Sequence, residues 1–334
     1  MRWLTPQMPP EMFTADAAMG FRLTPLYRGA ERTQTGAIPL SFNSLGLRDR
    51  EYGARPAGGW RIYVLGDSFV FGQRVPAEET FAKVLERALQ ERLPGRQVDV
   101  INGGVPRFGT LQEVALFERT VAAVQPDVVV LGIFVGNDVL DNLAFAHTRA
   151  RRGGESFTHS VADWVRMHSH LYIWLRRRQH AAVERQHSLQ RHAMETHSVT
   201  LSPEMQQGLT LTEDAIARLA TTARQHGARL ALVLIPSAAQ VYPPLWQQAL
   251  AHDGLAAAEY DSSQPNTRLA AWAEAARIPL LDLQPAWQAH GNEPLYFTLH
   301  WNARGHAVAA EATAQFLDTA GLLARPDAVA ASLQ

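Results

Sequence analysis

From Arg61 onward, short β-forming runs alternate with stretches of helical periodicity, and this alternation constrains the fold most strongly. The β-forming runs are residues 62–65, 98–101, 128–135, 230–235 and 280–283. The helical stretches include residues 81–93, 111–124 and an alanine-rich segment from about 303 to 317. Strands that alternate with helices favour a parallel sheet. We therefore expect an α/β domain in which helices cover both faces of a parallel sheet.

The composition and charge of the chain exclude several classes of protein. With 46% hydrophobic residues over 334 positions, the chain can bury a sizeable core and is not disordered as a whole. The formal net charge of -1 lacks the basic excess of a dedicated nucleic-acid binder, so we expect no nucleic-acid partner. The chain contains no cysteine, which excludes disulfide frameworks, thiolate zinc sites and cysteine nucleophiles. Any nucleophile must be an oxygen or a nitrogen.

We expect four segments along the chain. Residues 1–55 carry prolines, glycines and scattered aromatic residues, and are predicted to form an irregular arm that wraps around the domain. Residues 56–325 form the α/β domain, which contains a helical insertion at 144–209. Residues 326–334 form a tail.

No part of the sequence predicts a membrane span or an export signal. The longest apolar run, 128–135, has eight residues and is far too short to cross a bilayer. The first twenty residues include prolines and acidic residues, unlike a signal peptide. We therefore expect a cytoplasmic protein, or a periplasmic or extracellular one if an N-terminal anchor precedes this sequence.

The insertion is rich in histidine and arginine. Eight of the thirteen histidines lie between His147 and His197. A metal site that includes His168 and His170 is one interpretation, and an arginine patch for an anionic surface is another. No ligand spacing recurs, so we favour a helical excursion with a solvated basic face.

Small and polar residues follow three of the expected strands and precede the last helix. These segments are residues 66–69, 102–106, 136–138 and 300–302. In an open parallel sheet, ligands bind outside the carboxyl ends of the strands. Segments that are far apart in the sequence can therefore meet at one edge of the sheet.

Together these segments contain the groups that acyl transfer requires. Ser68 is a candidate nucleophile and His300 the base that takes its proton. The backbone N–H groups of Ser68 and Gly104 and the side-chain amide of Asn137 can bind the oxyanion of a tetrahedral intermediate. Glycine at position 104 lets the backbone approach the substrate. We expect Asp67 to shape the serine turn by hydrogen bonding. Each segment alone is also typical of a turn or helix cap, so the combination carries the prediction.

The combination resembles the SGNH, or GDSL, hydrolase superfamily of serine esterases. Ser68 lies in Gly-Asp-Ser-Phe and Gly104 in Asn-Gly-Gly-Val-Pro. Asn137 lies in Gly-Asn-Asp and His300 in His-Trp-Asn, which completes the four blocks of the family.

This resemblance covers about residues 40 to 320. It includes Asn-Ser-Leu-Gly-Leu-Arg at 43–48, ahead of the first strand, and Asn-Ala-Arg-Gly-His at 302–306. The resemblance implies a flavodoxin-like, three-layer α/β/α domain. It also implies hydrolysis of acyl esters through an acyl-enzyme, with neither a metal nor an organic cofactor.

One position departs from the family pattern. Family members usually carry an aspartate two or three residues before the histidine, where this chain has Thr298 and Phe297. Loss of the orienting aspartate lowers turnover about 10⁴-fold in the Ser-His-Asp template. Three explanations are open: a backbone carbonyl accepts from His300, Glu293 or Asp282 reaches the ring, or most of the activity is lost. We favour the first, a Ser-His dyad, because the other three blocks are intact.

Other catalytic motifs are absent from the sequence. Val70 replaces the last glycine of a Gly-x-Ser-x-Gly elbow, which argues against an ordinary α/β-hydrolase. Neither a phosphate-binding Gly-x-x-x-x-Gly-Lys loop nor a zinc-binding His-Glu-x-x-His helix occurs.

We therefore expect a serine esterase that acts on acetyl or other short-chain esters of small molecules or glycans. One alternative keeps the same site and acts as an O-acyltransferase or deacetylase of cell-envelope polysaccharide. A second alternative is a non-catalytic carbohydrate-binding protein on the same fold, suggested by the missing aspartate.

Overall fold

A five-stranded parallel sheet forms the centre of the structure. The computed structural model describes residues 8–33, 36–55, 57–152, 194–297 and 299–324. The strands are β5 (Trp60–Gly66), β6 (Val98–Gly104), β7 (Val128–Phe134), β8 (Arg229–Ile235) and β9 (Leu280–Asp282). Their order in the sheet is β6-β5-β7-β8-β9. In chain order this is 2-1-3-4-5, the order of flavodoxin-like sheets.

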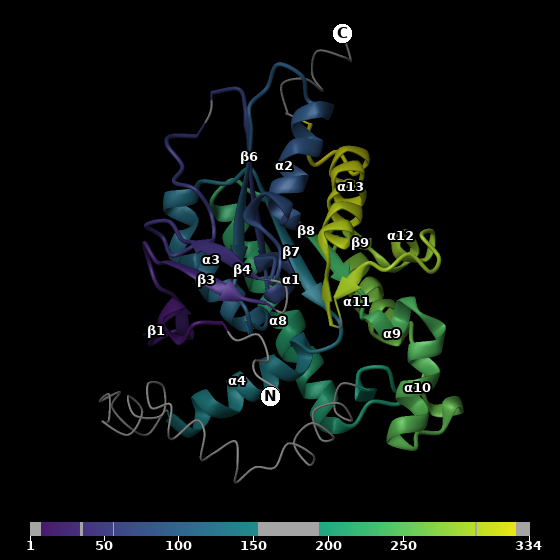
Figure 1. The fold of residues 1–334 in the computed structure, drawn as a ribbon. Helices are drawn as coiled ribbons and strands as arrows, with labels where there is room; N and C mark the ends of the chain where they lie inside the picture. Colours follow the sequence, from purple (N-terminus) through teal and green to yellow (C-terminus); the bar gives the residue numbers. More distant parts are fainter. Residues whose placement is uncertain (1–7, 34–35, 56, 153–193, 298, 325–334) are drawn as a thin grey trace.

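Helices cover both faces of this sheet (Figure 1). One face carries α2 (Phe81–Arg92), α12 (Gln284–Gln288) and α13 (Ala303–Thr319). The other face carries α3 (Thr110–Val124), α8 (Pro203–Gln225) and α11 (Gln264–Ala275), and α4 (Asp138–Arg152) packs against α8. The remaining short elements are α1 (Ser68–Phe71), α9 (Ala238–Val241), α10 (Pro243–Asp253), η1 (Pro10–Met12), η2 (Ala77–Glu79), η3 (Ala257–Glu259), β10 (Tyr296–Phe297) and β11 (His300–Trp301).

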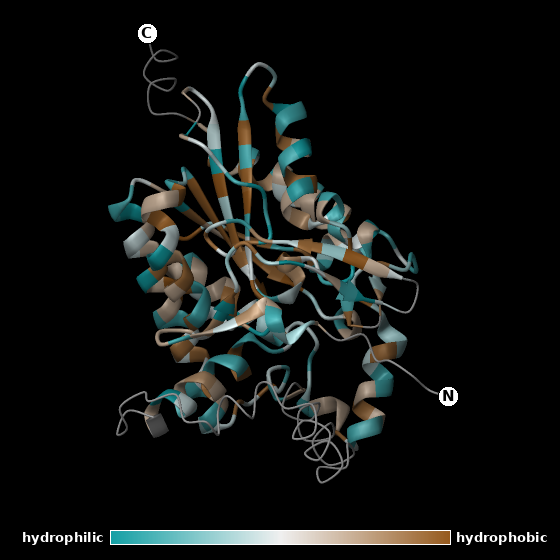
Figure 2. Cartoon of the chain, turned by 60° about the vertical axis from the view of Figure 1, so that its left-hand side comes forward, coloured by the Kyte–Doolittle hydropathy of each residue, from teal (hydrophilic) through white to brown (hydrophobic). Residues whose placement is uncertain are grey.

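The sheet strands bury alternate side chains in two cores. In β5, Tyr63 and Leu65 pack in the core that contains α3 and α8. Ile62 and Val64 pack in the opposite core with α2 and α13. Every residue of β5 and β6 is buried, and Figure 2 shows the hydrophobic strands at the centre of the fold. Continuous burial is typical of parallel strands that are covered on both faces.

The strands and helices that the alternation predicted are confirmed. Each of the five β-forming runs corresponds to one strand of the sheet, with ends that differ by at most three residues. The helical stretches correspond to α2, α3 and α13. The three-layer, flavodoxin-like α/β/α fold is therefore confirmed.

The N-terminal residues are more regular than expected. Phe13–Asp16 (β1) pairs with Gly20–Leu23 (β2), and Arg28–Arg32 (β3) pairs with Ala37–Ser41 (β4), in two antiparallel hairpins. These hairpins were not predicted, because strands of four or five residues show too little alternation to be recognised. Apolar side chains of this arm pack in the core beside α3: Met12, Met19, Leu23, Leu40, Phe42 and Leu47.

The expected insertion at 144–209 lies partly outside the described residues. Its flanks are the end of α4 and the start of α8. Residues 153–193, which include His168 and His170, are not among the described residues, and neither is the expected tail at 326–334. In the part of the chain that is described, no helix has the length and apolar character to cross a membrane.

Candidate active site

Ser68 begins the short helix α1 directly after β5, at the carboxyl edge of the sheet. Asp67 caps this helix, because its Oδ1 accepts a hydrogen bond from Phe69 N at 2.8 Å. The helix has four residues and ends at Gly72, whose φ of 77° is left-handed and favours glycine. As the first helical residue, Ser68 has a backbone N–H without an acceptor inside the helix.

His300 approaches Ser68 from β11. Its Nε2 lies 2.8 Å from Ser68 Oγ, and its ring centroid lies 5.2 Å from that of Phe69. Burial, and to a smaller extent the positive charge of Arg74, lowers the pKa of His300 to about 4. The imidazole is therefore neutral at pH 7, and Nε2 can accept the hydroxyl proton.

Trp301, the neighbour of the histidine, anchors β11 in the core. This side chain is 1% exposed, and its ring centroid lies 5.0 Å from that of Phe69 and 5.1 Å from that of Trp287. The tip of the β10–β11 hairpin is exposed, with Phe297 at 44% and Leu299 at 73%. The histidine thus lies between a buried aromatic anchor and an exposed turn.

The structure brings neither of the two expected acids to His300. Asp282 accepts a hydrogen bond from Asn266 Nδ2 at 2.8 Å and another from a backbone N–H at the start of α12. Glu293 forms an ion pair with Arg304 at 2.8 Å and contacts a neighbouring histidine. Within the described residues, the imidazole forms one hydrogen bond, to the serine hydroxyl. Both carboxylates are bonded to other groups, and within the described residues neither forms a hydrogen bond with the ring.

Asn137 lies just beyond the carboxyl end of β7. Its Nδ2 donates one hydrogen to Asp141 Oδ2 at 2.8 Å, which leaves the second hydrogen of the amide for another acceptor. The two residues are four apart at the start of α4 and therefore share one face. Burial raises the pKa of Asp141 to about 7, although the charge of Arg107 opposes this rise. Asp141 thus fixes the direction in which the amide points.

Gly104 packs against the nucleophile helix, which is a reason for this glycine that the sequence did not reveal. A Cβ at this position would lie 2.0 Å from Phe71 N and 2.5 Å from the carbonyl carbon of Val70. The absence of a side chain therefore lets α1 lie on β6. The N–H of Gly104 donates to Asn102 Oδ1 at 3.0 Å, so this N–H already has an acceptor.

Four carboxyl groups cluster near the serine: those of Asp67, Glu113, Asp138 and Asp141. Of these, the sequence predicted only Asp67 to lie beside the serine. Asp67 is 1% exposed, and Glu113 and Asp138 are fully buried. Burial raises the pKa of all four groups, and repulsion among them adds to the rise for Asp67, Glu113 and Asp138. A larger protonated fraction limits the negative charge near the serine. The burial of Glu113 could have been predicted from the sequence, because Glu113 lies four residues from Phe117 and therefore on the buried face of α3.

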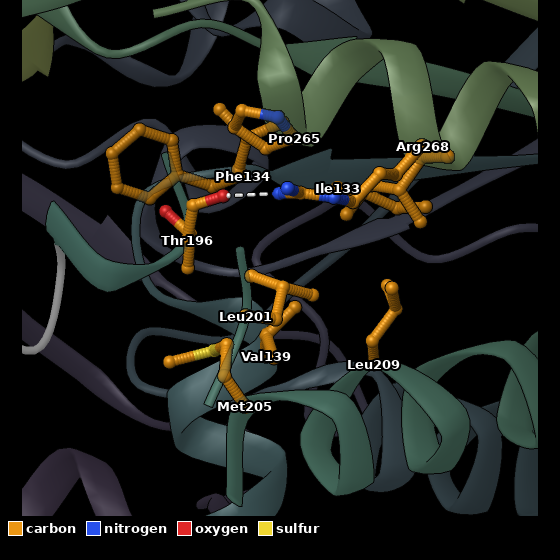
Figure 3. A pocket seen from close by; sticks show the side chains of 11 residues that line it. Ile133, Phe134, Val139, Thr196, Leu201, Met205, Leu209, Pro265 and Arg268 are labelled. Atoms are coloured by element: carbon orange, nitrogen blue, oxygen red, sulfur yellow. Dashed lines mark hydrogen bonds between the residues drawn. The ribbon is translucent and has the colours of Figure 1, made fainter. Parts of the chain in front are cut away.

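An apolar pocket lies beside the end of β7 (Figure 3). Its volume is about 360 Å³, including space that is open to solvent, and its apolar lining includes Val139, Met205 and Leu209. Arg268 donates to Thr196 O at 2.9 Å, the bond drawn in Figure 3. Phe134 lines the pocket, and its ring centroid lies 4.5 Å from that of Phe69, next to the serine. The two rings meet at an interplanar angle of 42°, so the residue next to Ser68 contacts a residue that lines the pocket.

The described histidine at the end of the His-rich region has a structural environment. His197 is 3% exposed, and its Nδ1 lies 3.2 Å from Ser262 O. Its ring contacts Trp246 edge to face. Among the residues that the structure describes, no group of three or more histidine, aspartate or glutamate side chains is arranged to hold a metal ion.

Several solved structures, two of them of esterases, resemble the chain at low sequence identity. The crystal structure of TesA is 15% identical, and the match covers 79% of this chain and 99% of TesA with a TM-score of 0.45. A catalytic mutant of Axe2, an acetylxylan esterase from Geobacillus stearothermophilus, is 14% identical over 79% of this chain and 96% of Axe2, with a TM-score of 0.45. A two-domain esterase active on acetylated mannans is 17% identical over 80% of this chain and 51% of its own, with a TM-score of 0.43. No curated protein matches the chain.

The sequence family described as GDSL-like lipase/acylhydrolase matches residues 64–308. This range covers more than half of the chain and contains all four strand-end segments, whereas the hairpins of the N-terminal arm precede it. The resemblance noted in the sequence is therefore confirmed. The chain belongs to the GDSL-like lipase/acylhydrolase family and is a carboxylic ester hydrolase of the SGNH/GDSL type.

Proposed function

We propose that the protein is a serine esterase that hydrolyses acyl esters through an acyl-enzyme on Ser68. The observation that carries the proposal is the 2.8 Å separation of Ser68 Oγ and His300 Nε2. As Oγ attacks the ester carbonyl, His300 takes the hydroxyl proton and then gives it to the departing alcohol oxygen. A water molecule attacks the acyl-enzyme in the second half-reaction, while His300 takes its proton. The acid is released, and the proton returns to Ser68 Oγ.

In this proposal two donors bind the oxyanion. The N–H of Ser68 belongs to the first helical turn and has no acceptor within the helix, and the amide of Asn137 has one hydrogen beyond its bond to Asp141. Gly104 can be a third donor only by exchanging its bond to Asn102 for one to the oxyanion. We therefore assign the larger part of oxyanion stabilisation to Ser68 and Asn137.

In this mechanism His300 works without a carboxylate partner. Burial keeps the imidazole neutral, with a pKa of about 4, so the base is in its active form at neutral pH. The packing of Trp301 and Phe69 limits the positions of the ring. A base with a low pKa gives less driving force for proton transfer, so turnover is expected to be slower than with an orienting aspartate.

The substrate in this proposal carries a short acyl group, such as acetyl, on a small-molecule or glycan alcohol. The supporting observation is the contact between the tilted rings of Phe69, which follows the serine, and Phe134, which lines the apolar pocket. Hydrolysis of p-nitrophenyl acetate should therefore exceed that of the octanoate ester. Faster hydrolysis of the octanoate would contradict a short acyl site and leave the serine mechanism intact.

The test of the mechanism compares the wild type with Ser68→Ala on p-nitrophenyl acetate. The alanine variant should lose about 10⁴-fold or more in kcat, as for removal of other serine nucleophiles. A fluorophosphonate should label Ser68 in the folded wild type and leave the variant unlabelled. Equal turnover by the two proteins would show that Ser68 is not the nucleophile, and an unlabelled wild type would favour a non-catalytic binding protein.

A further inference from the structure

Two charged residues of the N-terminal arm contact the segments that carry the serine and Gly104. Arg48 and Asp49 lie ahead of the family match, which begins at residue 64. We propose that Arg48 and Asp49 are positioning residues for ester hydrolysis, and that the arm supports the site from a segment ahead of residues 64–308. The inference rests on the proposed function, because it assigns these residues to the placement of Ser68.

Arg48 holds the end of the nucleophile helix. Its Nη1 donates to Phe71 O at 3.0 Å and to Gly72 O at 2.6 Å, and its Nη2 donates to Val75 O at 2.7 Å. The guanidinium carbon also lies 4.8 Å from the centre of the Phe71 ring. A cation at a helix C-terminus interacts favourably with the free carbonyls and with the helix dipole. One side chain thus joins three carbonyls in and beyond the last turn of α1.

The hydrogen bonds of Arg48 are linked to Ser68 through a single turn of helix. The Ser68 carbonyl accepts from Gly72 N at 3.2 Å and from Gln73 N at 3.2 Å. Arg48 binds the carbonyl of that same Gly72. A helix of four residues is too short to be stable by itself, so its geometry depends on such outside contacts. Displacement of Gly72 therefore moves the residue that carries the nucleophile.

Arg48 is buried at 3% exposure, and a buried charge needs compensation. Burial lowers the pKa of Arg48 to about 10, so the group remains cationic at neutral pH, and the charge of Glu31 supports this state. Glu31 lies in β3, is 0% exposed, and accepts from Arg74 N at 3.0 Å. The arm thus holds the loop after α1 through both a cation and an anion.

Asp49 holds the second segment of the site. Its Oδ2 accepts from Asn102 N at 2.8 Å, and its Oδ1 pairs with Lys83 Nζ at 2.9 Å. The side chain of Asn102 in turn accepts from Gly104 N, and Gly104 is the residue on which α1 packs. The adjacent residues Arg48 and Asp49 therefore fix α1 and its support on β6 relative to each other.

The test measures the rate per active site in Arg48→Gln. Ser68 is titrated with a fluorophosphonate, and kcat on p-nitrophenyl acetate is expressed per labelled serine. We expect kcat per site to fall about 10- to 100-fold, since displacements of about 1 Å have effects of this size, while KM changes by less than about twofold. Arg48→Lys, which keeps the charge but not the fork of donors, should give an intermediate rate.

Arg28→Gln is the matched control. Arg28 also lies in the arm and donates to main-chain carbonyls, Phe42 O at 2.8 Å and Tyr27 O at 3.1 Å, and within the described residues no hydrogen bond joins it to α1. This variant should keep the wild-type kcat per site. A purely structural effect of Arg48→Gln would lower the melting temperature and the labelled fraction while the rate per labelled site stays at the wild-type value, and that result would overturn the inference.

Asp49→Asn provides a second test if Arg48→Gln does not fold. The amide keeps one acceptor for Asn102 N and loses the ion pair with Lys83, so a fall in kcat per site of about tenfold is expected. An unchanged rate per site in this folded variant would also overturn the inference. Failure of the proposed function looks different, because the wild type itself would then carry no label on Ser68.

Discussion

The two reacting side chains are held in very different ways. Ser68 begins a helix that follows a fully buried strand, and α1 is bonded at its start by Asp67 and at its end by Arg48. His300 lies in a two-residue strand of a hairpin whose tip is exposed, and Trp301 is its buried anchor. The difference indicates that the nucleophile is fixed by the backbone, whereas the position of the base depends on one aromatic contact surface.

The largest effect should come from removal of the base. We expect His300→Gln to lower kcat about 10³- to 10⁴-fold, because the serine hydroxyl then has no proton acceptor. Stopped assays on p-nitrophenyl acetate measure this loss. Leu299→Ser, a change at the exposed neighbouring position, serves as the control and should retain wild-type activity. A comparable loss in both variants would mean that the hairpin itself, and not the imidazole, determines the rate.

A smaller but still large effect is expected where the nucleophile helix rests on β6. Gly104→Ala places a methyl group 2.0 Å from Phe71 N, so the backbone must move. Such overpacking lowers the free energy of unfolding by about 1–3 kcal/mol, which thermal or urea unfolding measures. Gly53→Ala is the matched control, since nothing lies within 4 Å of a Cβ there. Equal stability of the two variants would show that α1 is not tightly packed.

The smallest predicted effect concerns pH. The pKa of His300 is lowered to about 4, so kcat/KM should hold from neutral pH down to about 5 and fall as pH drops through 4, where the base becomes protonated. Arg74 is the second cause of this shift after burial, so Arg74→Gln should move the acid limb to higher pH. Asp67→Asn should leave that limb in place, and any inflection that remains near pH 7 should then come from Asp141, whose pKa is also raised to about 7. An acid limb with its midpoint near the ordinary pKa of histidine would contradict the burial of the ring.

Much of this site could be predicted because parallel sheets obey a simple rule. Strand ends at one edge meet whatever their distance in the chain, so Ser68 and His300 could be paired across more than 230 positions. The prediction of these two residues required only their residue types and their positions after a strand or before a helix.

The remaining parts depend on contacts that no local pattern reveals. Gly104 looked like a residue that faces substrate, but its neighbours are α1 and the Asn102 side chain, which come from packing of distant elements. Asp282 and Glu293 were reasonable acids by sequence distance, yet each is bound by a closer partner. Arg48 lies in a motif that the sequence displayed, although only the fold shows which carbonyls it binds.

The exposed tip of the β10–β11 hairpin allows a spectroscopic test of whether the catalytic base moves. The chain has no cysteine, so Leu299→Cys introduces a single thiol at a position that is 73% exposed, one residue from His300. A fluorophore or spin label attached there reports on the hairpin alone. Its mobility, compared between free and acylated enzyme, records directly whether the histidine moves between the two halves of the reaction.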